Sequence, residues 1–248
     1  MTDPLASGLL TALFLLMAVL YASVGQGGGS GYLAAMAMVG MAPENIRQTA
    51  LTLNVIVATI GLVKFARAGY FDLGLCLPFV VASVPLAFLG GMFSLPAQVF
   101  KPLVAAVLLW AALLLLWRPV RDKKEETRAP PRPVSLVAGG GIGLLSGLIG
   151  IGGGVFLAPL LILRGWATPK VTAALSSAFI LVNSLAALAG VLSHDRSFPS
   201  LLPLWVLVVA VGGWIGAEFG AKRLSPKALQ KVLAAVLILA SLRIFLAG

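Results

Sequence analysis

Apolar blocks of about the length of a bilayer span recur along this sequence. A transmembrane helix needs about 20 predominantly apolar residues, and blocks of that order occupy residues 5–24, 73–93, 99–117, 201–219 and 232–247. Of the 248 residues 60% are hydrophobic and only 10% are charged, which is too little charge to hydrate the surface of a soluble domain of this size. The pattern predicts an all-α polytopic protein that crosses the lipid bilayer several times.

The basic residues indicate topology. A formal net charge of +10 would suggest nucleic acid as the partner of a soluble protein, but here Lys and Arg lie in loops and at segment ends, and no nucleic acid is expected. Six of them gather near the midpoint of the chain, in the polar, proline-rich stretch RPVRDKKEETRAPPRPV. We therefore divide the chain into a first transmembrane repeat at 1–117, a basic linker at 118–133 and a second transmembrane repeat at 134–248.

The two halves carry related motifs. In the order of the chain, the two copies are SVGQGGGSGYLAAMAMVGMAPEN at 23–45 and LIGIGGGVFLAPLLILRGWATPK at 148–170. Their matched residues are the glycines 27–29 and 152–154, Pro43 and Pro169, and Asn54 and Asn183. Because these pairs follow one another in the same order in both halves, they indicate a duplication.

Charge gives the orientation of the halves. We expect five segments in each, roughly 5–24, 31–42, 44–66, 72–94 and 97–117, then 134–149, 154–167, 169–193, 199–221 and 226–247. An odd number makes the repeats inverted, with the linker on one side of the cell (inner) membrane and both termini on the other. With the linker in the cytoplasm, 14 of the 18 Lys and Arg residues lie on that side, as the positive-inside rule requires. Four spans per half would divide them 10 to 8, which agrees less well.

The consecutive glycines predict a break after the first long helix of each half. A run of this density leaves backbone amides without helical partners, and such backbone is tolerated at membrane depth only inside protein or beside a water-filled cavity. The next helices are expected to start near Ser30 and Val155, where free N–H groups and the helix dipole suit an anion. Inverted repeats would bring the two short, glycine-broken helices together near the midplane, as in secondary transporters. Two purely structural hairpins are the alternative.

Two other sets of glycines, spaced by four, have a simpler interpretation. Small residues at that spacing line one face of a helix and let a neighbouring helix approach closely. We therefore expect packing seams at Gly139, Gly143 and Gly147, and at Gly212, Gly216 and Gly220.

Polar residues around the breaks and on the helix after each proline are the candidate site. Hydroxyls and amides donate hydrogen bonds to an anion without a fixed charge, although interhelical hydrogen bonding is the alternative role for each. The candidate substrate-binding residues are Gln26, Gly27, Gly28, Gly29, Ser30, Thr49, Thr52, Asn54, Gly152, Gly153, Gly154, Ser176, Ser177 and Asn183. Since the repeat mate of Gln26 is Ile151, the site is expected to be asymmetric.

Ionisable residues inside or beside spans are functional candidates by default. Glu218 lies one turn before the expected end of its helix and is a candidate for proton coupling, with a simple helical pair to Lys222 as the alternative. His194 follows a span and would titrate near neutral pH, although a lone loop histidine is usually solvated. Glu44 and Arg47 are expected to form a short-range pair at the membrane interface.

At the twin glycine motifs the sequence resembles the sulfite/sulfonate exporter family called TauE/SafE. The resemblance lies in VGQGGGSGYLAAM…P and IGIGGGVFLAPLL…P, in the polar helix after each proline and in the glycine-rich span before the last helix of each half, and it covers nearly the whole chain. The first copy departs from the pattern, because Gln26 interrupts the glycines and no proline matches Pro159. The resemblance implies transport of sulfur-containing anions such as sulfite, sulfoacetate or related organosulfonates.

These observations favour a secondary transporter of small sulfur-containing anions that works in export, by alternating access around a midplane site. An anion channel with the same site and a transporter of small organic carboxylates are the alternatives. No enzyme, cofactor or metal site is expected, because the sequence has no HExxH, no paired intramembrane carboxylates, no Cys/His metal spacing and no Walker motif. The expected partners are a small anion, the lipid bilayer and a coupling proton or sodium ion; the oligomeric state is not indicated.

Overall fold

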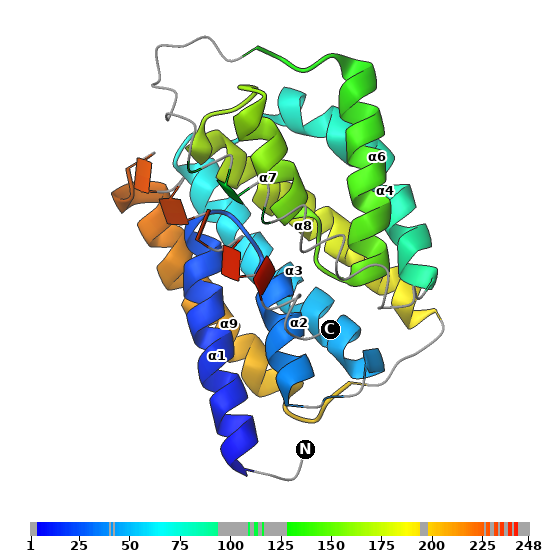
Figure 1. Cartoon of the computed structure of the whole chain (residues 1–248), viewed down its shortest axis with the longest axis vertical. Helices are drawn as coiled ribbons and strands as arrows, with labels where there is room; N and C mark the ends of the chain where they lie inside the picture. Colours follow the sequence, from blue (N-terminus) through cyan, green and yellow to red (C-terminus); the bar gives the residue numbers. More distant parts are fainter. Residues whose placement is uncertain are drawn as a thin grey trace.

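The computed structural model describes residues 4–39, 41, 43–93, 109, 112, 113, 116, 128–193, 198–225, 227, 228, 231, 232, 234, 235, 238, 239, 241 and 242. Over this part of the chain the structure is built from helices without strands (Figure 1), so the predicted all-α fold class is confirmed. Five of the described helices are long and apolar enough to cross a membrane. The chain is accordingly a multi-pass membrane protein.

The helices follow the expected segments closely. They are α1 (Pro4–Ser23), α2 (Gly29–Met38), α3 (Pro43–Arg67), α4 (Leu73–Met92), α6 (Arg132–Ile149), α7 (Gly154–Leu163), α8 (Pro169–Leu192) and α9 (Leu202–Glu218), followed by the π-helical turn η1 (Phe219–Arg223). The segments expected at 97–117 and 226–247 lie largely outside the described residues. The repeat boundaries and the inverted orientation of the repeats stay predictions.

Helix boundaries follow from local chemistry. Pro43 and Pro169 are the first residues of α3 and α8, where the missing N–H of proline would have had no helical partner in any case. The α4 helix starts after Asp72, whose Oδ1 accepts a hydrogen bond from the Leu75 amide at 3.0 Å. Gly150 ends α6 in the left-handed conformation, which glycine adopts at little cost.

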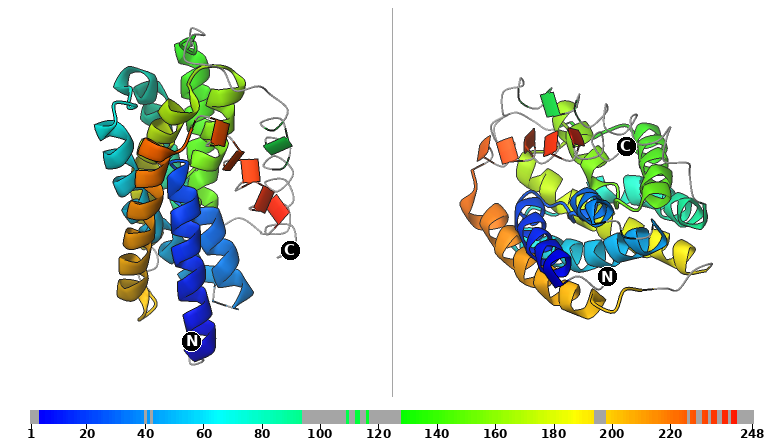
Figure 2. Two further views of the ribbon diagram at one scale, coloured as in Figure 1. Left: turned by 90° about the vertical axis from the view of Figure 1, so that its left-hand side faces the viewer. Right: turned by 60° about the horizontal axis from the view of Figure 1, so that its bottom comes forward.

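The α3 and α8 helices form the centre of the bundle and pack against each other. On α3 lie α9 and α1, which run side by side in both views of Figure 2, and on α8 lie α4 and α6. Both expected glycine seams are confirmed, because a Cβ at Gly143 would collide with the backbone of Ser83 in α4, and one at Gly216 with the Val19 carbonyl in α1. Backbone contact of this kind lets helices pack closely in lipid.

Corresponding helices of the two halves make corresponding contacts. The α1 helix packs on α9 as α6 packs on α4, and α3 packs on α9 as α8 packs on α4. Likewise α2 lies against α3 and α7 against α8, with α2 in the lower and α7 in the upper part of Figure 1. The α4 helix therefore packs on helices of the second half, and α9 on helices of the first.

Candidate functional site

Both glycine runs break the helix where the sequence predicts. The α1 helix ends at Ser23 and α2 begins at Gly29, while α6 ends at Ile149 and α7 begins at Gly154. Gly28 has a φ of 97° and Gly153 a φ of 81°, a backbone region that other residues rarely adopt. We call residues 24–28 the first hairpin and residues 150–153 the second hairpin.

The two hairpins meet inside the bundle. Asn54 of α3 donates a hydrogen bond from Nδ2 to the Ile151 carbonyl of the second hairpin at 3.0 Å. Its amide also fills the space beside Gly27 and Gly29, because a Cβ built on Gly29 would lie 2.5 Å from Nδ2 and 2.8 Å from the Ile151 oxygen. Asn54 is fully buried. One amide of the first half therefore touches both breaks.

A second link runs from the first hairpin to the start of α7. Gln26, which is 1% exposed, donates from Nε2 to the Gly154 carbonyl at 3.2 Å. The α8 helix closes the other side, where Ile180 lies against Gly27, Gly152 and Gly154. We call the residues that meet here the hairpin cluster. Its members are Gln26, Gly27, Gly29, Asn54, Ile151, Gly152, Gly154 and Ile180, with Ser184 beside Gly152.

Ser177 of α8 also reaches the first hairpin. Its Oγ donates to the Gly25 carbonyl at 3.1 Å or to the Ala173 carbonyl at 2.9 Å. Ser30, in the first turn of α2, shares a hydrogen bond of 3.0 Å with the Tyr21 hydroxyl. Both serines are buried, so these two sequence-predicted residues anchor the first break.

Several buried polar atoms of the cluster have no hydrogen-bond partner among the described residues. Gln26 Oε1, Asn54 Oδ1 and Ser184 Oγ belong to this group, and a Cβ built on Gly152 would lie 2.9 Å from Ser184 Oγ and 3.1 Å from Asn54 Nδ2. Buried polar atoms are nearly always paired with protein, water or ligand. Two of these three atoms are amide oxygens, which would be satisfied by a hydrogen-bond donor, and the Ser184 hydroxyl is the one of the three that could donate to an anion.

The helix starts add electrostatic character. The first N–H groups of a helix have no partner within it and carry a partial positive charge. At α7 the N-cap residue is Gly153, and no side chain caps the helix there. Because α2 and α7 both begin at the hairpin cluster, two helix N-termini lie close together in one buried region, a setting in which an anion is favoured.

Two other predicted residues make hydrogen bonds within their own helices. Thr52 is bonded to the Gln48 carbonyl at 2.8 Å, and Asn183 Nδ2 to the Phe179 carbonyl at 2.8 Å, so both turn to their own helices. Thr49 and Ser176 are buried, and their hydroxyls have no hydrogen-bond partner within the part of the chain that the structure describes. Asn54 and Asn183, which match in the repeat, therefore differ in their hydrogen bonds, since Asn54 bonds the second hairpin and Asn183 bonds its own helix.

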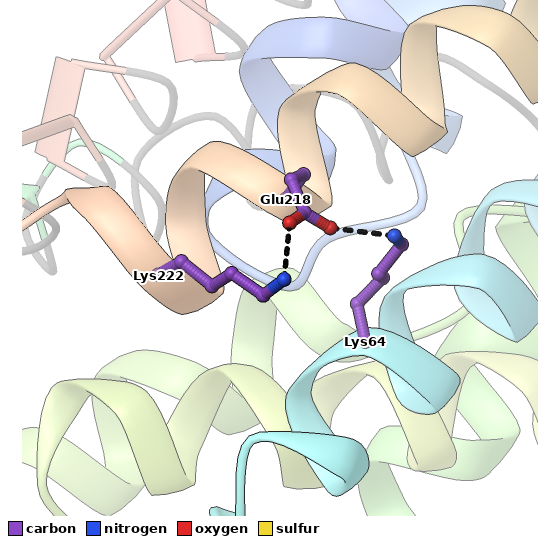
Figure 3. Close-up of polar contacts among 3 residues, drawn as sticks. All are labelled: Lys64, Glu218 and Lys222. Atoms are coloured by element: carbon purple, nitrogen blue, oxygen red, sulfur yellow. Dashed lines mark hydrogen bonds and ion pairs between the residues drawn. The ribbon is translucent and has the colours of Figure 1, made fainter.

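Glu218 lies between two lysines at the end of α9. Its Oε2 is 2.5 Å from Lys64 Nζ of α3, and its Oε1 is 2.6 Å from Lys222 Nζ (Figure 3). Lys64 also lies over the Trp214 ring, 3.5 Å from its centroid. The expected pair with Lys222 is present, and Lys64 extends it to α3. His194, the other candidate for proton coupling, lies outside the described residues.

Because both Glu218 oxygens are bonded, we predict a structural role for this carboxylate. Glu218→Gln should lower the midpoint of thermal unfolding by a few degrees and leave the response of anion flux to a pH gradient unchanged. Lys222→Gln, which keeps the Lys64 pair, is the milder control. Flux in proteoliposomes with and without the gradient measures the effect, and a loss of the pH response in Glu218→Gln would restore Glu218 as the coupling residue.

The hairpin cluster is closed to solvent in this structure. Gln26, Asn54 and Ser184 are buried, and a cavity of about 460 Å³ lies elsewhere, between the loops that include Tyr70 and Trp166. Ile151, Ile180 and Ser184 also belong to the cluster, although they were not among the residues predicted from the sequence. The repeat match with Gln26 drew attention to the position of Ile151. Its contact, however, is made by the backbone carbonyl, and the type of side chain does not predict which backbone carbonyl accepts a hydrogen bond.

Comparison with known proteins adds a family. The chain matches the family described as "Sulfite exporter TauE/SafE" over residues 10–244. It is also 38% identical over 245 residues to "Probable membrane transporter protein y4hK" of Sinorhizobium fredii (strain NBRC 101917 / NGR234), an alignment that covers 98% of this chain and 99% of that protein. No solved structure matches the chain.

Proposed function

The chain belongs to the sulfite exporter TauE/SafE family of membrane proteins, and from this premise we propose that it is a secondary transporter of small sulfur-containing anions, of the sulfite and organosulfonate class. Transport is proposed in the direction of export, by alternating access around the hairpin cluster. The observation that carries the proposal is the meeting of two glycine-broken helix starts in one buried region, with Asn54 hydrogen-bonded to Ile151 across it.

The chemistry of the cluster fits a small oxyanion. Free backbone N–H groups at two helix N-termini stabilise negative charge without a fixed cation, so binding stays weak enough for release. Broken helices with their N-termini at a central site recur in secondary transporters of anionic substrates. The buried state of Gln26 and Asn54 agrees with an occluded form, in which neither side of the membrane has access.

The remaining assignments complete the proposal. The substrate-binding group comprises the residues named from the sequence, with the hairpin glycines, Gln26 and Asn54 at its centre. The protein is placed in the cell inner membrane with the basic linker in the cytoplasm and both termini opposite, since this puts most Lys and Arg on one side. A proton or sodium ion is the proposed coupling partner.

Flux in proteoliposomes tests the function. Purified protein is reconstituted and loaded with sulfite, an organosulfonate or a small carboxylate, with and without a pH or sodium gradient, and protein-free liposomes are the control. We expect saturable sulfite and sulfonate flux that responds to one gradient. Carboxylate flux without sulfite flux would contradict the substrate class, and a fast, charge-carrying flux would indicate the channel alternative.

A further inference from the structure

Arg47 is a cation near the start of α3, inside the candidate membrane span 45–67. Its Nη2 donates to the Gly90 carbonyl at 2.7 Å and to the Gly147 carbonyl, and its Nη1 donates to the Phe93 carbonyl at 3.0 Å. These carbonyls belong to the C-terminal ends of α4 and α6. One guanidinium therefore joins three helices at this end of the bundle.

Among the described residues, the contacts of Arg47 are backbone carbonyls and one of its donors has no partner. The last carbonyls of a helix carry partial negative charge and attract a cation, but a carbonyl has no full charge to match a guanidinium. The Nε atom is buried and has no hydrogen-bond partner among the described residues. A guanidinium binds a planar or tetrahedral oxyanion through several parallel donors, so an anion would satisfy it better than the carbonyls do.

The position of Arg47 connects it to the hairpin cluster. A Cβ built on Gly150, the residue that opens the second hairpin, would lie 2.8 Å from Arg47 Cγ. Asn54 lies seven residues further along α3, about 10 Å along the helix axis, and bonds the next residue of the same hairpin, Ile151. Positions seven apart share one helix face. One face of α3 therefore contacts the second hairpin at two successive residues, with Arg47 beside Gly150 and Asn54 bonded to Ile151.

We propose that Arg47 is an access site for the transported oxyanion, which binds the guanidinium at the start of α3 before it reaches the hairpin cluster. The anion displaces the carbonyls of Gly90 and Gly147, and this frees the second hairpin to move. The inference rests on the proposed transport of a small oxyanion and adds a residue to that pathway. Charged residues inside spans commonly mark ion and substrate pathways.

Chemical restoration of the charge provides the test. Cys76 is the single cysteine of the chain, so Cys76→Ala gives a background in which Arg47→Cys is the sole thiol. Sulfite flux is measured before and after reaction with aminoethyl methanethiosulfonate, which adds a cation, or with its hydroxyethyl analogue, which is neutral. We expect the KM for sulfite to rise about tenfold or more, the order of a lost charge-assisted contact, and the cationic reagent alone to reverse most of this rise.

Controls separate an access site from a structural clamp. Arg164→Cys in the same background removes an exposed guanidinium beside Trp166 and should leave KM unchanged with either reagent. Arg47→Lys keeps the charge and should change KM far less than Arg47→Met, which covers the case in which the cysteine variant does not insert. A pure clamp would lower the amount of inserted protein or the maximal rate at constant KM.

Two outcomes overturn the inference: an unchanged KM in both Arg47→Cys and Arg47→Met, or equal restoration by the neutral and cationic reagents. Failure of the proposed function looks different, because wild-type protein would then carry no sulfite at all. If the wild type transports sulfite with saturable kinetics and Arg47 variants keep its KM, the hairpin site stands and the access site does not.

Discussion

Gly29→Ala is expected to reduce sulfite flux by about a hundredfold or more while the protein still inserts into the membrane. The added Cβ would lie 2.5 Å from Asn54 Nδ2 and 2.8 Å from the Ile151 oxygen, so the two hairpins must separate. The Ile151 oxygen belongs to the backbone and cannot rotate away. Displacing groups at a site by about 1 Å costs on the order of a hundredfold in rate, and here the displacement also breaks the contact between the two helix starts.

The matched control for Gly29→Ala is Gly141→Ala. Gly141 lies within α6 and has nothing within 4 Å of a built Cβ, so the same chemical change meets open space and slightly favours the helix. Flux in proteoliposomes, normalised to inserted protein, compares the two. A bulky residue at Gly28 or Gly153 should act like Gly29→Ala, since both have positive φ. Normal flux in Gly29→Ala would place the site elsewhere.

Asn54→Leu should abolish sulfite flux and also destabilise the protein. The Ile151 carbonyl loses its donor inside the bundle, and an unpaired buried acceptor costs about 1–3 kcal/mol. We expect the midpoint of thermal unfolding in detergent to fall and flux to be lost even where the inserted amount is restored by lower temperature. Both quantities are measured on the same purified sample.

Asn54→Asp separates the loss of the site from the loss of stability. The side chain keeps its size, but the donor to Ile151 becomes a second oxygen, and the negative charge repels the substrate anion from the hairpins. We expect this variant to be at least as inactive as Asn54→Leu. Thr59→Ala serves as control, because the exposed Thr59 hydroxyl bonds only the Val55 carbonyl of its own helix among the described contacts. Near-normal flux in Asn54→Asp would exclude Asn54 from the anion site.

The sequence predicted the helices and their breaks because each depends on local chemistry. The length of each apolar block predicts a membrane span, and consecutive glycines destabilise a helix, so they predict where it ends. The predicted helix starts near Ser30 and Val155 differ by one residue from the observed starts at Gly29 and Gly154. The four-residue glycine spacing likewise predicted both packing seams, since close helix approach depends only on which residues share a face.

The bonding of the polar residues was harder to predict. Asn54 was expected to donate to an anion, but its Nδ2 is bonded to Ile151, 97 residues away. Asn183, its repeat mate, turns to the Phe179 carbonyl. An asparagine side chain can hydrogen-bond a substrate, a neighbouring helix or its own backbone. Which of these partners it bonds depends on how the helices pack, and a match between repeats in the sequence does not show that packing.

The charged residues show the same limit. The Glu218–Lys222 pair could be foreseen from its spacing of four, whereas Lys64 reaches Glu218 from 154 residues away. The expected pair of Arg47 with Glu44 stays a prediction, because the Glu44 side chain lies outside the described residues. The bonds of Arg47 to the carbonyls of Gly90, Phe93 and Gly147 could not be foreseen, because they depend on three helix ends that converge only in the tertiary structure.

Equilibrium binding of radiolabelled sulfite to purified protein tests the hairpin site most directly, since it needs neither a gradient nor a known direction of transport. Wild-type protein and Gly141→Ala are compared with Gly29→Ala at matched amounts of folded protein. We predict saturable binding to the first two and its loss in Gly29→Ala, where the hairpins are forced apart. Equal sulfite binding by all three proteins would contradict an anion site between the two helix breaks.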